Sequence, residues 1–318
     1  MERRRRSVSS GVLVCGNAVM DLLVRPVESI RWDATTWVES IERSIGGNGA
    51  NTAYALARLG TPARLMSLVG VDEFGSQVAE ILAEAGVDTA WVARCAAPTG
   101  VTVALVRPDG ARAFLHRPGS SGEAFPEAPV FPPELTAGMS RFHLANPYAL
   151  PNMRRHAAVT RERARAAGLA TSVDAGWDAK GEWMQVMAPA LPHTGILFVN
   201  EEESRMLTGR PEYRAAAADL LCAGAQIVVV KLGCRGCAVF TRESDFHSPA
   251  VRVEVVDTTG AGDCFAAGFL SALQRGASLE EAAREANAAG AASVSALGAV
   301  SGLRDFEEIR RLAASQKA

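Results

Sequence analysis

The feature that most constrains the fold is a repeated alternation between short apolar runs and alanine-rich segments with helical spacing. The apolar runs are rich in β-branched residues and are short, as expected for buried strands. Strands are predicted over residues 12–15, 64–69, 141–144, 170–173, 196–199 and 227–231. Helices are predicted over residues 51–58, 76–85, 153–167, 213–222, 262–274 and about 279–296. Strands that alternate with helices build a mostly parallel, buried sheet, so the sequence predicts an α/β fold.

Two stretches interrupt this alternation. Residues 99–119 read TGVTVALVRPDGARAFLHRPG, in which Pro108-Asp109-Gly110 separates two strand-like runs and predicts a hairpin. A less regular stretch covers about residues 21–45. Together these segments are expected to form a small β-sheet that acts as a lid. Since no repeat or long linker divides the chain, residues 1–318 are predicted to be a single domain, with residues 1–10 as a disordered basic tail.

Composition narrows the class of partner. Hydrophobic residues make up 48% of the chain, charged residues make up 21%, and the formal net charge is −2. This charge gives no field that would attract nucleic acid or an anionic membrane, so a small neutral or anionic ligand is expected instead. The basic N-terminus and the apolar run after it superficially imitate a signal peptide, but Asp21 interrupts the run. No window of 18 uninterrupted apolar residues predicts a transmembrane helix.

The six cysteines are scattered rather than spaced like a disulfide framework. Reduced thiols, and therefore a cytoplasmic location, are expected. Cys234-Arg-Gly-Cys237 has the spacing of a metal or redox pair, but no second pair follows at the spacing of a zinc site. A glycine-rich turn that contains cysteines is the favoured interpretation.

The segment IGGNGANTAYALARLG, residues 45–60, combines glycines with two asparagines at the start of a predicted helix. Glycines let the backbone approach a ligand closely, while the amides of Asn48 and Asn51 donate and accept hydrogen bonds, which suits recognition of hydroxyl groups. Asp21 follows the first strand and "GNAV", where ligands bind in parallel α/β sheets, and its carboxylate can accept hydrogen bonds from a polyol. The alternatives are a helix cap for Asn51 and a solvated turn for Asp21.

The segment VDTTGAGDCFAAGFL, residues 256–270, follows the strand-like run VRVEVV and places a glycine turn at the start of a helix. Backbone N–H groups at such a start, aided by the helix dipole, stabilise an anion such as a phosphoryl group in transfer. Asp263 in the first turn can accept a proton from an attacking hydroxyl. The alternatives are a partial dinucleotide-binding turn and a charge that only stabilises the helix. The phosphate loop G-x-x-x-x-G-K-[ST] does not occur.

These segments resemble the signatures of the ribokinase-like (PfkB) family of carbohydrate and nucleoside kinases, and the resemblance extends over nearly the whole chain. GGNGANTAYALARLG resembles the first family signature and DTTGAGDCFAAGF resembles the second. Asn200-Glu-Glu-Glu203 resembles the family's N-x-x-E motif, and KLGCRG resembles its strand-turn element beside the nucleotide. The resemblance implies a three-layer α/β/α sandwich with a mostly parallel central sheet and a small β-sheet lid.

The resemblance also implies roles for individual residues. Asp263 is the catalytic base, and Gly260, Ala261 and Gly262 form the anion hole for the γ-phosphoryl group. Substrate-binding roles are implied for Asn17, Asp21, Gly47, Asn48, Asn51 and Asn146, with His116 from the lid as a further candidate. Roles in binding ATP and handling magnesium are implied for Asn200, Glu203, Lys231, Gly233, Gly236, Thr258 and Asn287. Asp257 and Thr259 match positions that hold a monovalent cation, usually potassium, although the downstream GAVSG departs from the common spacing.

Other departures bear on the substrate. Ribokinases proper usually have lysine where Asn48 stands, and ketoacid-sugar kinases usually supply an arginine where DAGWDAKG has none, unless Arg112 or Arg117 of the hairpin substitutes. The resemblance therefore implies ATP- and magnesium-dependent phosphorylation of a primary hydroxyl of a neutral sugar. A nucleoside kinase is the nearest alternative, and a catalytically silent sugar-binding regulator is a second.

Phe114 and His116 alternate on one face of a lid strand, and with Trp177 they are candidates to cover the substrate. The alternative is that these side chains only pack the small sheet or face solvent. The lid strands have unpaired edges that a second subunit can cover. Because members of the family often dimerise through such lids, the resemblance also implies a homodimer through the lid.

Overall fold

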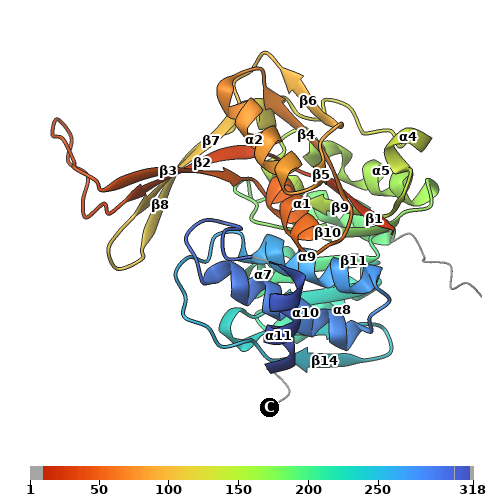
Figure 1. Ribbon diagram of the computed structural model, residues 1–318. Coiled ribbons are helices and arrows are strands. Elements are labelled where there is room, and N and C mark those ends of the chain that lie inside the picture. The colour runs from red at the N-terminus through yellow and green to blue at the C-terminus, as the bar shows by residue number, and fades with distance from the viewer. Residues whose placement is uncertain (1–9, 304, 316–318) are drawn as a thin grey trace, which may run out of the picture.

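The computed structural model describes residues 10–303 and 305–315, and a ten-stranded sheet forms its centre (Figure 1). The main path of this sheet runs β14-β13-β12-β11-β10-β9-β1-β4-β5, and β6 pairs with β4. Its strands are β1 (Gly11–Cys15), β4 (Ala63–Gly70), β5 (Val87–Asp88), β6 (Val92–Cys95), β9 (Met139–Ala145), β10 (Ala170–Asp174), β11 (Ile196–Asn200), β12 (Ile227–Lys231), β13 (Cys237–Phe240) and β14 (Asp245–Ser248). Pairing is parallel except at β13 and β14, which are antiparallel to their neighbours.

Helices cover both faces of this sheet. They are α1 (Asn48–Arg58), α2 (Glu73–Glu84), α3 (Ser120–Glu123), α4 (Pro133–Thr136), α5 (Met153–Ala166), α6 (Met184–Met187), α7 (Glu201–Thr208), α8 (Tyr213–Cys222), α9 (Ala261–Gln274), α10 (Leu279–Val294) and α11 (Phe306–Ser315). Because successive strand residues point to opposite faces, Val12 and Val14 join a core with α1, α9 and α10, while Leu13 and Cys15 join a core with α5 and α8. The α/β/α arrangement predicted from the sequence is therefore confirmed.

A separate four-stranded sheet, called here the lid sheet, projects from the body of the molecule (Figure 1). Its order is β3-β2-β7-β8, with β2 at Val19–Arg25, β3 at Ser40–Gly46, β7 at Gly100–Val106 and β8 at Arg112–Arg117. Strands β7 and β8 are the antiparallel hairpin expected from Pro108-Asp109-Gly110. The two segments expected to form a lid thus pair with each other, although they lie far apart in the sequence.

Close packing of small residues brings α1, α9 and α10 together. Helix α9 contacts both α1 and α10. A Cβ atom added to Gly268 would lie 2.8 Å from the Cβ of Ala289, so α10 lies too close to α9 for a side chain at position 268. The contact between α1 and α9 joins the two glycine-rich motifs, and the start of α9 carries Asp263.

The structure differs from the sequence-based expectations at several elements. The strand-like run at 251–256 is not a strand. Helix α1 begins at Asn48 rather than Asn51, and α10 ends at Val294. The short strands β5, β6, β13 and β14 and the helices α3, α4, α6, α7 and α11 were not predicted. Residues 1–9 of the predicted basic tail lie outside the described residues, and within the described ranges no helix is long and apolar enough to cross a membrane.

Candidate active site

Polar side chains stand at the carboxyl ends of five neighbouring parallel strands. Asp174, Asn200 and Lys231 are the last residues of β10, β11 and β12, while Asn146 and Asn17 lie just beyond β9 and β1. These strands are consecutive in the sheet, in the order β12-β11-β10-β9-β1. Parallel strands end at the same edge, which is where ligands bind in open α/β sheets.

Helix α9 begins at this edge with the Gly260-Ala261-Gly262 turn. Gly260 precedes the helix with φ 71, and a Cβ there would lie 2.4 Å from the carbonyl oxygen of Ala299, so the position requires glycine. No side chain caps the helix start, and the backbone N–H of Ala261 donates to the carbonyl oxygen of Thr258 at 3.4 Å, which leaves the N–H of Gly262 available to an anion. The anion hole at this turn stays a prediction.

Asp263, in the first turn of α9, is held by two amides of α1. Its Oδ1 accepts a hydrogen bond of 2.9 Å from Asn48 Nδ2, and its Oδ2 accepts one of 2.9 Å from Asn51 Nδ2. Burial raises the pKa of Asp263 to about 7, even though these two hydrogen bonds act in the opposite direction. A carboxylate that titrates near neutral pH is suited to act as a general base.

The amides around Asp263 form a connected group, called here the amide cluster: Asn17, Asn48, Asn51 and Asn146. Asn17 Oδ1 accepts from the backbone N–H of Asn48 at 3.0 Å, and Asn146 Nδ2 donates to Asn48 Oδ1 at 3.0 Å. The buried Oδ1 of Asn51 has no partner among the described residues. Gly47, with φ 90, precedes α1 and lies so close to Asn17 that a Cβ would be 2.6 Å from the Asn17 carbonyl oxygen. Thus the structure brings these five predicted substrate residues together beside Asp263.

Lys231 and Asp174 form an ion pair on the other side of the α9 start. Lys231 Nζ donates to Asp174 Oδ2 at 2.6 Å, and it lies 3.2 Å from where a Cβ of Gly262 would be. Burial favours the neutral amine, but Asp174 and Glu203 outweigh this effect and raise the pKa of Lys231 above its ordinary value. A permanent positive charge therefore lies beside the anion hole. Asp174 was not predicted as a site residue, although it ends a strand at the ligand-binding edge.

A cavity of about 550 Å³ adjoins the same helix start and is called here the nucleotide cavity. Seven of the residues that line it were predicted from the sequence as site residues: Lys231, Gly233, Gly236, Thr258, Ala261, Gly262 and Asn287. Apolar side chains provide much of the remaining wall, among them Val251, Val255, Phe265 and Val294. The run 251–256, which was wrongly expected as a strand, thus contributes to a cavity wall. Size and lining suit a flat, largely apolar ring with a polar tail directed at the α9 start.

Other predicted nucleotide-side residues also have structural contacts. Asn287 Nδ2 donates to the carbonyl oxygens of Ser248 and Pro249 at 3.1 and 3.0 Å, and so ties down the loop beside the cavity. Asn200 and Glu203 form a reciprocal cap at the start of α7. Glu203 is buried, and burial raises its pKa. The Cys234 turn is a short 3-10 helix, Gly233–Arg235, and all six cysteines are free.

One row of side chains crosses the lid sheet. Asp21 on β2 pairs with Thr102 on β7, which pairs with His116 on β8. Burial raises the pKa of Asp21 to about 6, and the Asp21 carboxylate lies against Gly46, where a Cβ would be 2.2 Å from it. His116 Nδ1 lies 3.2 Å from Thr102 Oγ1. Trp177 packs edge-on against Trp183, with 5.0 Å between the ring centroids, and is half exposed.

Arg112, at the start of β8, contacts the turn that precedes the anion hole. Its guanidinium forms an ion pair with Asp257 and donates to Thr259 Oγ1 at 2.5 Å and to Thr258 Oγ1 at 2.6 Å. These contacts involve both side chains that were predicted to hold a monovalent cation, Asp257 and Thr259. The sequence does not reveal this pairing, because Arg112 and Asp257 lie 145 positions apart.

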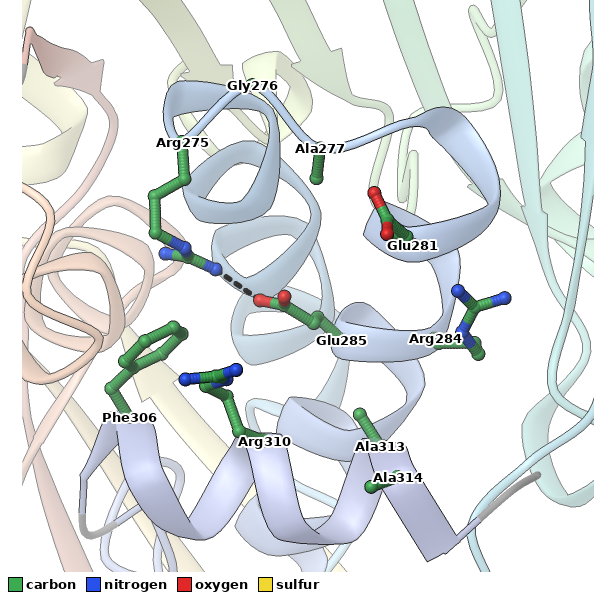
Figure 2. Close-up of a pocket in the computed structure, with 10 residues that line it drawn as sticks. All are labelled: Arg275, Gly276, Ala277, Glu281, Arg284, Glu285, Phe306, Arg310, Ala313 and Ala314. Atoms are coloured by element: carbon green, nitrogen blue, oxygen red, sulfur yellow. Dashed lines mark hydrogen bonds and ion pairs between the residues drawn. The ribbon is translucent and has the colours of Figure 1, made fainter. Parts of the chain in front are cut away.

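A second cavity, of about 470 Å³, lies between the end of α9, α10 and α11, and Figure 2 shows its charged lining. The ion pair between Arg275 and Glu285 crosses it, and the Arg275 guanidinium stacks 4.1 Å from the centre of the Phe306 ring. None of the predicted site residues lines this cavity. The candidate active site is therefore the edge that joins the amide cluster, Asp263 and the nucleotide cavity.

Comparisons with known proteins show the family of this chain. The model of the pfkB family of carbohydrate kinases matches residues 9–305. Fructokinase-1 of Oryza sativa subsp. japonica is 30% identical over 92% of this chain and 95% of its own length. The aminoimidazole riboside kinase of Salmonella typhimurium is 30% identical over 81% of this chain and 84% of its own length.

Solved structures show the same fold. The Arabidopsis thaliana ribokinase complexed with ribose and ATP has a TM-score of 0.83 and 28% identity, over 96% of this chain and 98% of that chain. The aminoimidazole riboside kinase of Salmonella enterica, complexed with aminoimidazole riboside and an ATP analogue, has a TM-score of 0.78 and 26% identity. With a family match that spans nearly the whole chain, the protein belongs to the pfkB family of carbohydrate kinases and is an ATP-dependent kinase of sugars or nucleosides.

Proposed function

We propose that this kinase transfers the γ-phosphoryl group of ATP to a primary hydroxyl of a neutral sugar, with Asp263 as general base. The observation that carries the proposal is the position of Asp263. It lies at the start of α9, between four uncharged amides and the nucleotide cavity, with a pKa of about 7. The resemblance of the two glycine-rich motifs to the family signatures assigns the same role to this residue.

The reaction follows from these positions. The sugar hydroxyl gives its proton to an Asp263 carboxylate oxygen as its own oxygen forms a bond to the γ-phosphorus. The bond between the γ-phosphorus and the bridging oxygen breaks, and its electron pair leaves on ADP. Backbone N–H groups of the Gly260-Ala261-Gly262 turn and the Lys231 ammonium stabilise the charge on the phosphoryl oxygens.

Magnesium fits the donor set on the nucleotide side. Glu203 and Asp174 are buried carboxylates close enough to influence each other, and Asp174 contributes to the raised pKa of Glu203. Mg²⁺ prefers oxygen ligands and usually takes one or two carboxylates together with phosphates and water. When bound, it neutralises charge on the phosphates. In this proposal Glu203 and Asp174 would hold the ion, while Lys231 keeps Asp174 in place through their ion pair.

The choice of a neutral substrate is supported by the amide cluster. Amides recognise hydroxyls without adding charge, and the unpartnered Oδ1 of Asn51 offers an acceptor for one of them. Asp21 and His116 on the lid sheet supply further polar groups. A nucleoside acceptor is the alternative, supported by the similarity to aminoimidazole riboside kinase.

The test is ADP release from the purified protein with ATP and Mg²⁺, across neutral pentoses, hexoses, ketoses, ketoacid sugars and nucleosides, with Asp263→Ala as control. We expect turnover with one neutral sugar and a loss of about 10²–10⁴-fold in the control. Preference for a nucleoside selects the alternative. If no acceptor is phosphorylated but some raise the melting temperature, the protein is a silent sugar-binding regulator and the kinase proposal is wrong.

We also propose a homodimer through the lid sheet and a cytoplasmic location, which the free thiols suit. Exposed apolar side chains gather on the lid sheet and on the loop that joins β2 to β3, where Trp32, Trp37, Ile41 and Leu115 are 91%, 89%, 64% and 61% exposed. Covering such residues and the free edges of β3 and β8 favours association. Sedimentation of the parent and of a Trp32→Ser, Trp37→Ser double variant tests this; equal masses for the two proteins contradict it.

A further inference from the structure

The turn before the anion hole is organised by the Asp257 carboxylate. This side chain is only 2% exposed, and it accepts hydrogen bonds from the backbone N–H groups of Thr259 at 2.8 Å and of Gly298 at 2.9 Å. Ala299, next to Gly298, is the residue that packs against Gly260. Asp257 therefore joins the two backbone segments that shape the start of α9.

The charge that faces Asp257 comes from the lid sheet. Arg112 starts β8 on the same face as Phe114 and His116, and its guanidinium bridges Asp257, Thr258 and Thr259. Burial raises the pKa of Asp257, but the backbone N–H groups of Thr259 and Gly298 and the charge of Arg112 together hold it below its ordinary value. The Asp257 carboxylate is therefore ionised at neutral pH and keeps its ion pair with Arg112.

A monovalent cation does not fit this donor set. Asp257 Oδ1 and Thr259 Oγ1 both accept from Arg112, and Asp257 Oδ2 accepts from the backbone N–H of Gly298. A second positive charge placed here would also be repelled by the guanidinium, since repulsion between like charges is strong where water is excluded. The side chain of Arg112 is only 18% exposed, so solvent screens this repulsion weakly.

We propose that Arg112 is a positioning residue that latches the lid sheet to the 257–259 turn and takes the place of a monovalent cation beside the anion hole. The turn then reaches its working shape when the lid is closed, so substrate capture and formation of the phosphoryl site are coupled. This inference rests on the proposed kinase function. It also predicts that turnover does not depend on potassium.

The first test compares Arg112→Ala with Arg107→Ala. Arg107 lies in the same hairpin, and it is 58% exposed and pairs with Asp109 at the hairpin tip, so it serves as a matched control. We expect kcat of Arg112→Ala to fall about 10–10²-fold, because a small misplacement of catalytic groups has effects of that size. Arg107→Ala should match the parent. Added guanidinium ion should restore part of the lost kcat only in Arg112→Ala, which a general loss of stability would not allow.

The second test replaces KCl with choline chloride at constant ionic strength. The parent should turn over equally in both salts, whereas strong activation of the parent by potassium would overturn the proposal. Equal kcat values for Arg112→Ala and Arg107→Ala would overturn it as well.

Hydrogen–deuterium exchange separates the latch from the kinase function, because it does not need turnover. In Arg112→Ala, exchange should quicken both at the hairpin tip, residues 106–113, and at the 257–260 turn, while Arg107→Ala should leave the turn unchanged. If the parent phosphorylates no acceptor but this paired change occurs, the proposed function fails and the latch stands. If the parent is active and the 257–260 turn does not respond, the latch is wrong.

Discussion

The amide cluster and the nucleotide cavity lie on two sides of Asp263 and differ in polarity and in order. The amide cluster is buried or half-buried, and its members are already hydrogen-bonded to one another and to Asp263. The nucleotide cavity has a volume of about 550 Å³ and a largely apolar wall, part of which is the irregular run 251–256. The amide cluster is therefore preorganised by hydrogen bonds, whereas the nucleotide cavity is shaped mainly by apolar side chains.

This difference indicates how strictly each site selects its substrate. A site built to hydrogen-bond hydroxyls rejects an analogue that lacks one, since its buried polar groups are then left unpaired. An apolar cavity discriminates mainly by size and shape, and each lost methylene has a modest effect. We therefore expect strict selection of the acceptor and looser selection of the nucleoside triphosphate.

The largest expected effect comes from Asp263→Asn, which removes the base and keeps the shape. We expect kcat to fall about 10²–10⁴-fold, and the kcat/KM of the parent to rise with pH through about 7 as Asp263 loses its proton. A pH profile of kcat/KM checks this. A parent profile that stays flat from pH 5 to pH 9 would argue against Asp263 as the base.

The effect of Asp263→Asn on the stability of the folded protein should depend on pH. Because the folded-state pKa of Asp263 is raised to about 7, the stabilisation from its protonated form is present at low pH and is lost as pH rises through 7. The melting temperature of Asp263→Asn relative to the parent should therefore increase from pH 4 to pH 8. A constant difference would show that burial does not perturb this carboxyl.

Next in size is Lys231→Met, on the nucleotide side of the comparison. It removes the charge beside Gly262 and leaves Asp174 buried without its cation, so we expect a loss of about 10²–10³-fold in kcat and about 3–5 kcal/mol in stability. Asp174→Asn added to Lys231→Met should recover stability without recovering kcat. Recovery of both would mean that the Lys231 charge does not act on the phosphoryl group.

The smallest expected effects are changes in KM, and they distinguish the amide cluster from the nucleotide cavity. Asn146 has φ 51, a conformation that glycine adopts freely, so Asn146→Gly removes the amide without straining the backbone. We expect it to raise the KM for the sugar about tenfold and to leave the KM for ATP unchanged, since it removes one hydrogen bond. Gly290→Leu should raise the KM for ATP and leave the KM for the sugar unchanged, because Gly290 lines the nucleotide cavity.

Gly290→Ala is the control for this pair. A Cβ at position 290 makes only ordinary contacts, the nearest at 3.5 Å, so alanine should behave like the parent. Initial rates measured with one substrate varied at a time give both KM values. If either Asn146→Gly or Gly290→Leu changes the two KM values equally, the two sides are not independent.

The sequence predicted the central strands β1, β4, β9, β10, β11 and β12, because these are largely apolar runs with mostly buried residues. Asn48, Asn51 and Asp263 were identified because they lie in two glycine-rich motifs with unusual local composition. Asn17, Asn146 and Lys231 lie outside these motifs and were assigned only through the resemblance to the family. The prediction was wrong about residues 251–256, whose alternating valines line a cavity instead of joining a sheet. Strands β5, β6, β13 and β14 were missed because they have only two to four residues each, too few for a clear pattern.

Two site residues could not be inferred from local pattern. The role of Asp174 depends on its ion pair with Lys231, which lies 57 positions later. The role of Arg112 depends on its ion pair with Asp257, which lies 145 positions later. Neither residue stands in a distinctive motif, so its role appears only when the fold brings the partner alongside. The potassium expectation for Asp257 and Thr259 shows the same limit, since it depends on what else contacts them.

The hydrogen bonds between α1 and Asp263 join residues 215 and 212 positions apart, and this separation has a consequence for synthesis. At about 5–20 residues per second, the ribosome makes Asp263 roughly 10–40 s after Asn51. A nascent chain thus carries Asn48 and Asn51 well before the base and anion hole that we propose. If those roles are right, we expect a chain that has not yet made α9 to bind a sugar without consuming ATP.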